Sequence, residues 1–217
     1  MNENIEKTIK NLERNNIKAL YAENRRQAAI LVEQMLFENA VITLGGSVTV
    51  VESGIYDILA RPCYRLLDRN KKGADEAFRF NTFKETVGGD FYFCSSNAVT
   101  ENGELVNVDG FSNRISAMVF GPKKVVMIVG KNKLVKDVNE AFLRIKRIAA
   151  PKNCVRLSKN TPCVKLGHCM SLLKSENPDM TDGCQSPDRI CRNYSVIGPQ
   201  GEKDRICVII VDENLGY

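Results

Sequence analysis

The strongest constraint on the fold of this chain is the alternation of short apolar runs with helix-like segments along its first 150 residues. Short β-prone runs that end in turn residues predict strands at residues 17–21, 41–44, 64–67, 91–94 and 125–129. The intervening segments predict helices at residues 3–15, 23–37, 49–60, 71–84, 112–120 and 135–150. Strands alternating with helices are typical of an α/β fold with a Rossmann-like, mainly parallel sheet and helices on both faces.

The chain changes character after residue 150. Pro151 is expected to close the preceding helix, because proline cannot continue the helical hydrogen bonds. Residues 152–192 lose apolar periodicity and gather cysteine, proline and glycine, which predicts an irregular cysteine-containing segment. Residues 206–211 predict a returning strand that rejoins the sheet. The length suits one domain, so we predict a single α/β domain over residues 1–217, with an N-terminal helix within residues 1–15.

Composition limits the partners that the chain is expected to have. The formal net charge of +5 favours anionic partners only mildly, and no run of lysine and arginine is long enough to predict nucleic-acid binding. No apolar stretch approaches the ~20 residues needed to span a bilayer. Residues 1–14 are polar and lack the apolar core of a signal peptide. We therefore expect a cytoplasmic protein without a membrane span.

A glycine-rich turn forms the first candidate site. Gly45, Gly46 and Ser47 follow a predicted strand and open a predicted helix, where two glycines let the backbone approach a ligand closely. Ser47 or Thr49 can cap the helix, and free N–H groups at its start attract an anion. Glu52 can close a capping box or meet the ligand. The alternative is an ordinary strand-to-helix turn.

A second candidate site lies between residues 95 and 114. Its polar residues are Ser95, Ser96, Asn97, Thr100, Glu101, Asp109, Asn113 and Arg114. Such polar density directly after an apolar strand suits a site at the carboxyl end of that strand. Arg114 can pair with a carboxylate or phosphate, and Asp109 can orient it or act as a base. The alternative is a capped hairpin that turns at residues 101–103 and returns as a strand at 105–108.

The cysteine segment is the third candidate. Cys163, Cys169, Cys184 and Cys191 are spaced as C-x5-C, fourteen residues, and C-x6-C. Four thiolates can hold zinc or an iron–sulfur cluster, although this spacing is wider than in common zinc knuckles. The alternative is a set of free thiols in an irregular loop. His168 is the only histidine of the chain, so a serine–histidine–acid triad has little support.

Several longer segments together resemble the lactate-utilisation (LUD) domain family. They are residues 44–54, 64–69, 96–110, 113–114, 120–124 and 148–153, with residues 161–163 and 184–191 near the C-terminus. The resemblance extends from about residue 11 to residue 210, and its most specific part runs from Asn97 to Gly110. Two features depart from the family pattern. Residues 94–96 replace a glycine-containing turn, and residues 171–182 resemble an insertion in the cysteine segment.

The resemblance implies a Rossmann-like sheet related to the sugar-phosphate isomerase and coenzyme A transferase superfamily. It implies a role in bacterial lactate use, beside iron–sulfur partner proteins that oxidise lactate to pyruvate. Carried over residue by residue, the implied pocket consists of Gly45, Gly46, Ser47, Thr49, Glu52, Asn97, Thr100, Asp109, Asn113 and Arg114.

Two functions fit these observations. The first is an accessory or ligand-binding component of lactate use that holds a small organic acid or a phosphorylated ligand, with iron–sulfur protein subunits as partners. No flavin or nicotinamide fingerprint occurs, so electron transfer would depend on those partners or on the cysteine segment. The second is a stand-alone transferase or isomerase. Residues 101–103 resemble the Glu-Asn-Gly element of some coenzyme A transferases, in which the glutamate, here Glu101, is the nucleophile.

Overall fold

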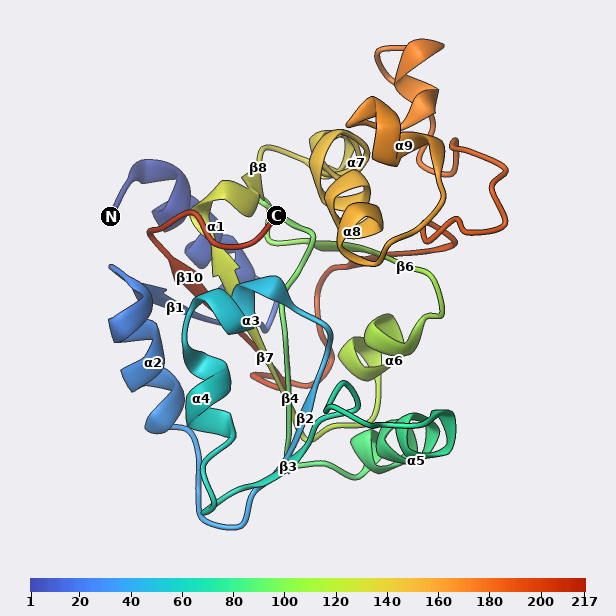
Figure 1. Cartoon of the computed structure of the whole chain (residues 1–217). Helices are drawn as coiled ribbons and strands as arrows, with labels where there is room; N and C mark the ends of the chain where they lie inside the picture. Colours follow the sequence, from blue (N-terminus) through green and yellow to red (C-terminus); the bar gives the residue numbers. More distant parts are fainter.

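A six-stranded, wholly parallel sheet forms the centre of the molecule (Figure 1). The computed structural model describes residues 1–217. The sheet has the strand order β1-β10-β7-β4-β2-β3. Its strands are β1 (Lys18–Ala22), β2 (Val41–Leu44), β3 (Arg65–Leu67), β4 (Phe91–Cys94), β7 (Lys124–Gly130) and β10 (Ile206–Val211). The predicted α/β fold with a Rossmann-like, mainly parallel sheet is confirmed.

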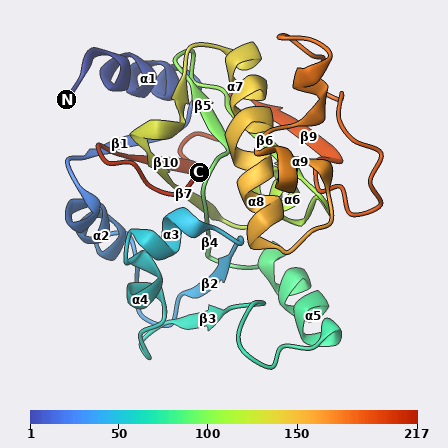
Figure 2. The ribbon, with the colours of Figure 1, turned by 45° about the horizontal axis from the view of Figure 1, so that its top comes forward.

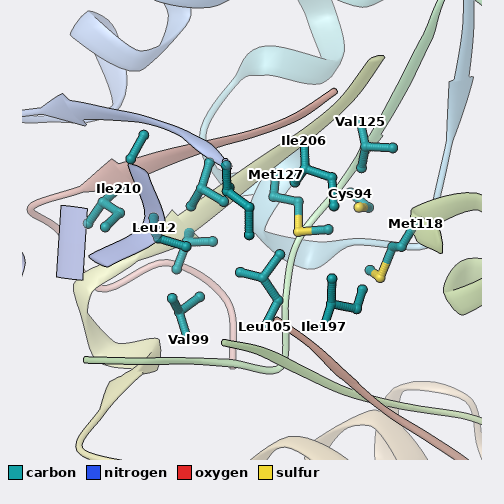
Figure 3. Close-up of a cluster of buried hydrophobic side chains, with 14 of the residues drawn as sticks. Leu12, Cys94, Val99, Leu105, Met118, Val125, Met127, Ile197, Ile206 and Ile210 are labelled. Atoms are coloured by element: carbon teal, nitrogen blue, oxygen red, sulfur yellow. The ribbon is translucent and has the colours of Figure 1, made fainter. Parts of the chain in front are cut away.

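Both faces of this sheet are buried, because successive side chains of a strand point to opposite faces. In β7, Val125, Met127 and Val129 belong to one hydrophobic cluster, whereas Val126 and Ile128 belong to another. Figure 3 shows part of the first cluster. Helices α1 (Glu3–Arg14) and α6 (Asn113–Val119) contribute to the first cluster, and α2 (Arg25–Glu33), α3 (Val48–Glu52) and α4 (Ile55–Leu59) contribute to the second. Helices therefore cover both faces.

A second, smaller sheet was not predicted from the sequence. It has the order β8-β5-β6-β9. Its strands are β8 (Leu134–Val135), β5 (Ala98–Thr100), β6 (Leu105–Asp109) and β9 (Asn193–Ile197). The strand predicted at residues 105–108 is β6, and its partner is β5, which three residues separate from the end of β4. One face of this sheet adds Val99, Leu105 and Ile197 to the first cluster.

A long broken helix covers the other face of the second sheet (Figure 2). It consists of α7 (Val138–Arg144), the π-helical turn η2 (Ile145–Ala149) and α8 (Ala150–Arg156). The expectation that Pro151 closes this helix is wrong. Pro151 lies in the first turn of α8, just after the π-helical turn, where the helical register has already changed and the missing N–H is tolerated. The helix therefore continues to Arg156.

The predicted helix at residues 49–60 is also divided. Gly54 adopts a left-handed conformation (φ 74°) and separates α3 from α4, because only glycine enters this region without a steric cost. Farther along, α5 (Glu76–Val87) begins five residues later than predicted. None of the helices has both the length and the apolar character needed to span a bilayer.

Residues 157–192 contain only short helical elements, α9 (Pro162–Leu166) and η3 (Met170–Leu173), besides turns and loops. This segment lies at one end of the molecule, beside α7 and α8 (Figure 1). From its end the chain enters β9 and then β10, which lies between β1 and β7 in the central sheet.

Candidate functional site

A pocket of about 560 Å³ opens at the carboxyl ends of the parallel strands. Its walls include residues 46–49 after β2, residues 69–70 after β3, residues 95–97 after β4, and Lys133 after β7. The chain leaves β2 toward the edge strand β3, whereas it leaves β4 in the opposite direction, toward β7. Such a reversal creates a crevice between neighbouring strand ends, which is the common ligand position in open α/β sheets.

The structure brings most of the predicted site residues to this pocket. The predicted residues that line it are Gly46, Ser47, Thr49, Ser95, Ser96, Asn97, Asp109, Asn113 and Arg114. Four others do not line it: Gly45, Glu52, Thr100 and Glu101. The Glu52 carboxylate accepts a hydrogen bond from the Gly216 N–H at 2.6 Å, and Thr100 is fully buried in β5. The Glu101 carboxylate lies 2.7 Å from Nζ of Lys7 in α1.

Gly45 has a packing role at the end of β2. A Cβ atom at this position would lie 2.6 Å from Oη of Tyr92 and 3.1 Å from Cβ of Cys94, both on the neighbouring β4. Ser47 caps α3 by accepting a hydrogen bond from the Val50 N–H at 3.3 Å. However, α3 has only five residues, so its dipole is too short to attract an anion by itself.

Arg114 is fully engaged by the protein. Its Nε donates to Asp109 at 3.0 Å, and its two terminal nitrogens donate to four further acceptors. These acceptors are the carbonyls of Ser95 and Val108 and the side-chain oxygens of Asn97 and Asn107, while Asp109 also forms an ion pair with Nη2 at 2.9 Å. Asp109 also accepts from the backbone N–H groups of Arg114 and Ile115 at the start of α6. All five N–H donors of Arg114 are therefore used within the protein, where they hold the pocket wall together.

Lys133 is a pocket residue that the sequence analysis missed. It is only 3% exposed, and its Nζ donates to the hydroxyl groups of Thr49 at 2.7 Å and Ser95 at 3.0 Å. It forms no salt bridge. Burial lowers the pKa of Lys133 to about 7, and the positive charges of Arg144 and Arg114 act in the same direction. Its position could have been predicted, because Lys133 follows the most apolar strand and the carboxyl ends of parallel strands meet at the same edge of the sheet.

Two arginines lie near Gly46. A Cβ atom on Gly46 would be 3.9 Å from Nη2 of Arg69 and 4.0 Å from Nη2 of Arg156. The Nε of Arg69 is buried and has no hydrogen-bond partner, whereas Arg156 donates to Asn153 and Tyr217. Neither arginine forms a salt bridge; Arg69 is half-buried and Arg156 is exposed.

The pocket is strongly positive as a whole. Its cationic side chains are Arg69, Arg79, Arg114, Lys133, Arg156 and Lys159. The only Asp or Glu side chain among the lining residues is Asp109, and Arg114 already neutralises it. Chemically, such a pocket can hold an anion. The Lys133 amine can also act as a base or attack a carbonyl group when it is neutral.

A parallel α/β sheet with a polar pocket where the strand order reverses defines a Rossmann-like α/β protein. More specifically, the chain belongs to the LUD domain family, whose model matches residues 5–211, which confirms the family predicted from the sequence. A crystal structure of a DUF162 family protein from Deinococcus radiodurans has a similar fold. Its TM-score is 0.50 at 11% identity, over 96% of this chain and 93% of that chain. No curated protein matches the chain.

Proposed function

We propose that this protein binds a small, multiply charged anion in the strand-end pocket, as a ligand-binding component of the use of lactate or related organic acids. The observation that carries this proposal is the excess of cations without carboxylate partners. Arg69, Arg156 and Lys133 line one pocket, and none of them forms a salt bridge. Uncompensated charge is costly where the group is buried, as it is at Nζ of Lys133 and Nε of Arg69.

The charge of the pocket favours a phosphorylated compound over a simple carboxylic acid. The guanidinium groups of Arg69 and Arg156, whose Nη2 atoms both lie near Gly46, are planar groups that suit phosphate and carboxylate oxygens. The strand order reverses between β2 and β4. Arg69 follows β3 on one side of this reversal, and Lys133 follows β7 on the other side. A ligand with a phosphate and a carboxylate could contact the two arginines with one group and Lys133 with the other, whereas lactate carries one charge only.

The link to lactate comes from the family. In this proposal the chain recognises the organic acid or a phosphorylated relative, and separate iron–sulfur protein subunits carry the electrons. Asn97 and Ser95 line the pocket beside Lys133 and can bind a hydroxyl or carbonyl oxygen of such a ligand. Glu101 has no part in this proposal, because it does not line the pocket.

Binding of simple anions is expected to follow their charge. In isothermal titration calorimetry we expect 3-phosphoglycerate to bind more tightly than inorganic phosphate, and phosphate more tightly than lactate or pyruvate. Arg69→Met and Arg156→Met are each expected to weaken 3-phosphoglycerate binding roughly 10–100-fold, because each removes a charge-assisted hydrogen bond worth about 1.5–3 kcal/mol.

Arg65→Met provides the matched control for this experiment. Arg65 is in β3, four residues before Arg69, but its guanidinium pairs with Glu85 at 2.7 Å and it does not line the pocket. This variant should bind 3-phosphoglycerate as the unaltered protein does. If Arg65→Met and Arg69→Met lost the same 3-phosphoglycerate affinity, the loss would be due to the general surface charge and not to the pocket. Absence of binding by all four anions would refute the proposed ligand class.

A further inference from the structure

Five cysteines surround a second cavity, which shares Ile190 with the strand-end pocket. Cys154 comes from α8, Cys163 from α9, and Cys169, Cys184 and Cys191 from the loops around η3 and before β9. The cavity has a volume of about 30 Å³. All eight cysteines of the chain are free thiols, and the other three are Cys63, Cys94 and Cys207. Five thiols from separate segments therefore line one cavity, and the fold of the central sheet does not explain why.

We infer that Cys163, Cys169, Cys184 and Cys191 form a metal centre of four thiolates, with zinc or an iron–sulfur cluster as the bound group. As the side chains stand, no group of three or more His, Cys, Asp or Glu side chains can hold one ion. Metal binding therefore requires the sulfurs to move inward from the walls of the cavity, to metal–sulfur distances near ~2.3 Å for zinc.

The charges around the cavity point to a bound anionic centre. Lys146 and Arg189 both line it, and neither forms a salt bridge. Lys146 is 5% exposed and donates to the Asp182 carbonyl and the Ser171 hydroxyl. Arg189 donates to the carbonyls of Thr181, Cys184 and Cys191 and to the Tyr194 hydroxyl. Four thiolates around Zn²⁺ carry a net charge of about −2, which these two cations would balance.

Two hydroxyl groups already contact the sulfurs. The Ser171 hydroxyl donates to Sγ of Cys169 at 3.2 Å, and the Thr161 hydroxyl lies 3.2 Å from Sγ of Cys163. Both residues are buried, at 5% and 4% exposure. Hydrogen bonds to ligand sulfurs orient them and tune their affinity for metal. Ser171 and Thr161 therefore occupy the positions that supporting residues of a thiolate site require.

The segment also lacks another source of order. Among residues 157–192 only Thr161 and Ser171 are fully buried, and both are polar. Ordering about 36 residues without a buried apolar side chain is unfavourable, because each ordered residue loses roughly 1–2 kcal/mol of backbone entropy. A metal that closes the segment would offset that cost.

Metal analysis of protein purified without oxygen and without chelators tests this inference. We expect about one zinc ion per chain, or about four iron ions with inorganic sulfide and a visible absorption band. Cys169→Ala and Cys184→Ala should lose the metal. Ser171→Ala keeps all thiols and should weaken metal affinity roughly 10–100-fold. Chelation should speed proteolysis within residues 157–192.

Cys63→Ala is the matched control, because Cys63 is exposed and does not line the cavity. It should retain the metal fully. Metal content that stays unchanged in Cys169→Ala and Cys184→Ala, or that falls equally in Cys63→Ala, would overturn the inference. So would protein that remains metal-free after reconstitution with zinc and with iron and sulfide. Circular dichroism of each variant separates loss of metal from loss of fold.

Discussion

Replacing Arg114 by methionine is expected to lower the free energy of unfolding by about 3–5 kcal/mol, the cost of breaking a buried ion pair from one side. The side chains of Arg114 and Asp109 are 12% and 8% exposed, so water cannot replace the lost partner. The substitution also leaves acceptors in β6 and in the loop after β4 without their donor. Urea unfolding followed by circular dichroism measures the change.

Two further variants serve as comparisons for the unfolding free energy of Arg114→Met. Arg114→Lys should also be strongly destabilising, because lysine cannot reproduce the planar set of five donors. Arg25→Met removes an exposed ion pair with Glu213 and should cost less than about 1 kcal/mol. A loss below that value for Arg114→Met would show that Arg114 is not the organising group of the pocket wall.

The central sheet could be predicted because its strands are short apolar runs, each followed by a turn. The second sheet could not. Its strand β5 has three residues, β8 has two, and β9 lies in a polar stretch where only Ile197 is fully buried. These strands form because they pack against α7 and α8 and complete the first cluster, which are tertiary effects. Likewise, the register change that lets Pro151 continue a helix has no local sequence signal.

The sequence indicated some residues of the candidate site and not others. Residues next to the ends of β2 and β4 were found, because strand ends mark sites in this kind of fold. The same rule applied to β3 and β7 would have found Arg69 and Lys133. Arg156 had no such signal, since it reaches the pocket from the end of α8. The hydrogen bonds of Arg114 could not be predicted, because a sequence does not show which donors are already used.

Replacing Lys133 by methionine is expected to stabilise the protein at neutral and acidic pH. The pKa of Lys133 falls from 10.5 to about 7 on folding, so below pH 7 the folded protein carries a buried charge. That shift corresponds to a cost on the order of 4–5 kcal/mol. The substitution also removes the hydrogen bonds to Thr49 and Ser95, which cancels about 2 kcal/mol of this gain in stability. A net gain of about 2–3 kcal/mol is therefore expected at pH 6.

The pH dependence of this gain is the sharper test. Between pH 7 and 10.5 the unfolded lysine binds a proton that the folded lysine has lost, so stability of the unaltered protein rises with pH. The advantage of Lys133→Met should therefore shrink by about 1.4 kcal/mol per pH unit from pH 7 to pH 9. Lys131→Met, which removes an exposed lysine paired with Asp212, should show no such slope. A constant difference between Lys133→Met and the unaltered protein over this range would mean that Lys133 keeps its proton in the fold. A bound anion should flatten the slope as well, because it holds the charged form of Lys133, and this effect should be absent from the methionine variant.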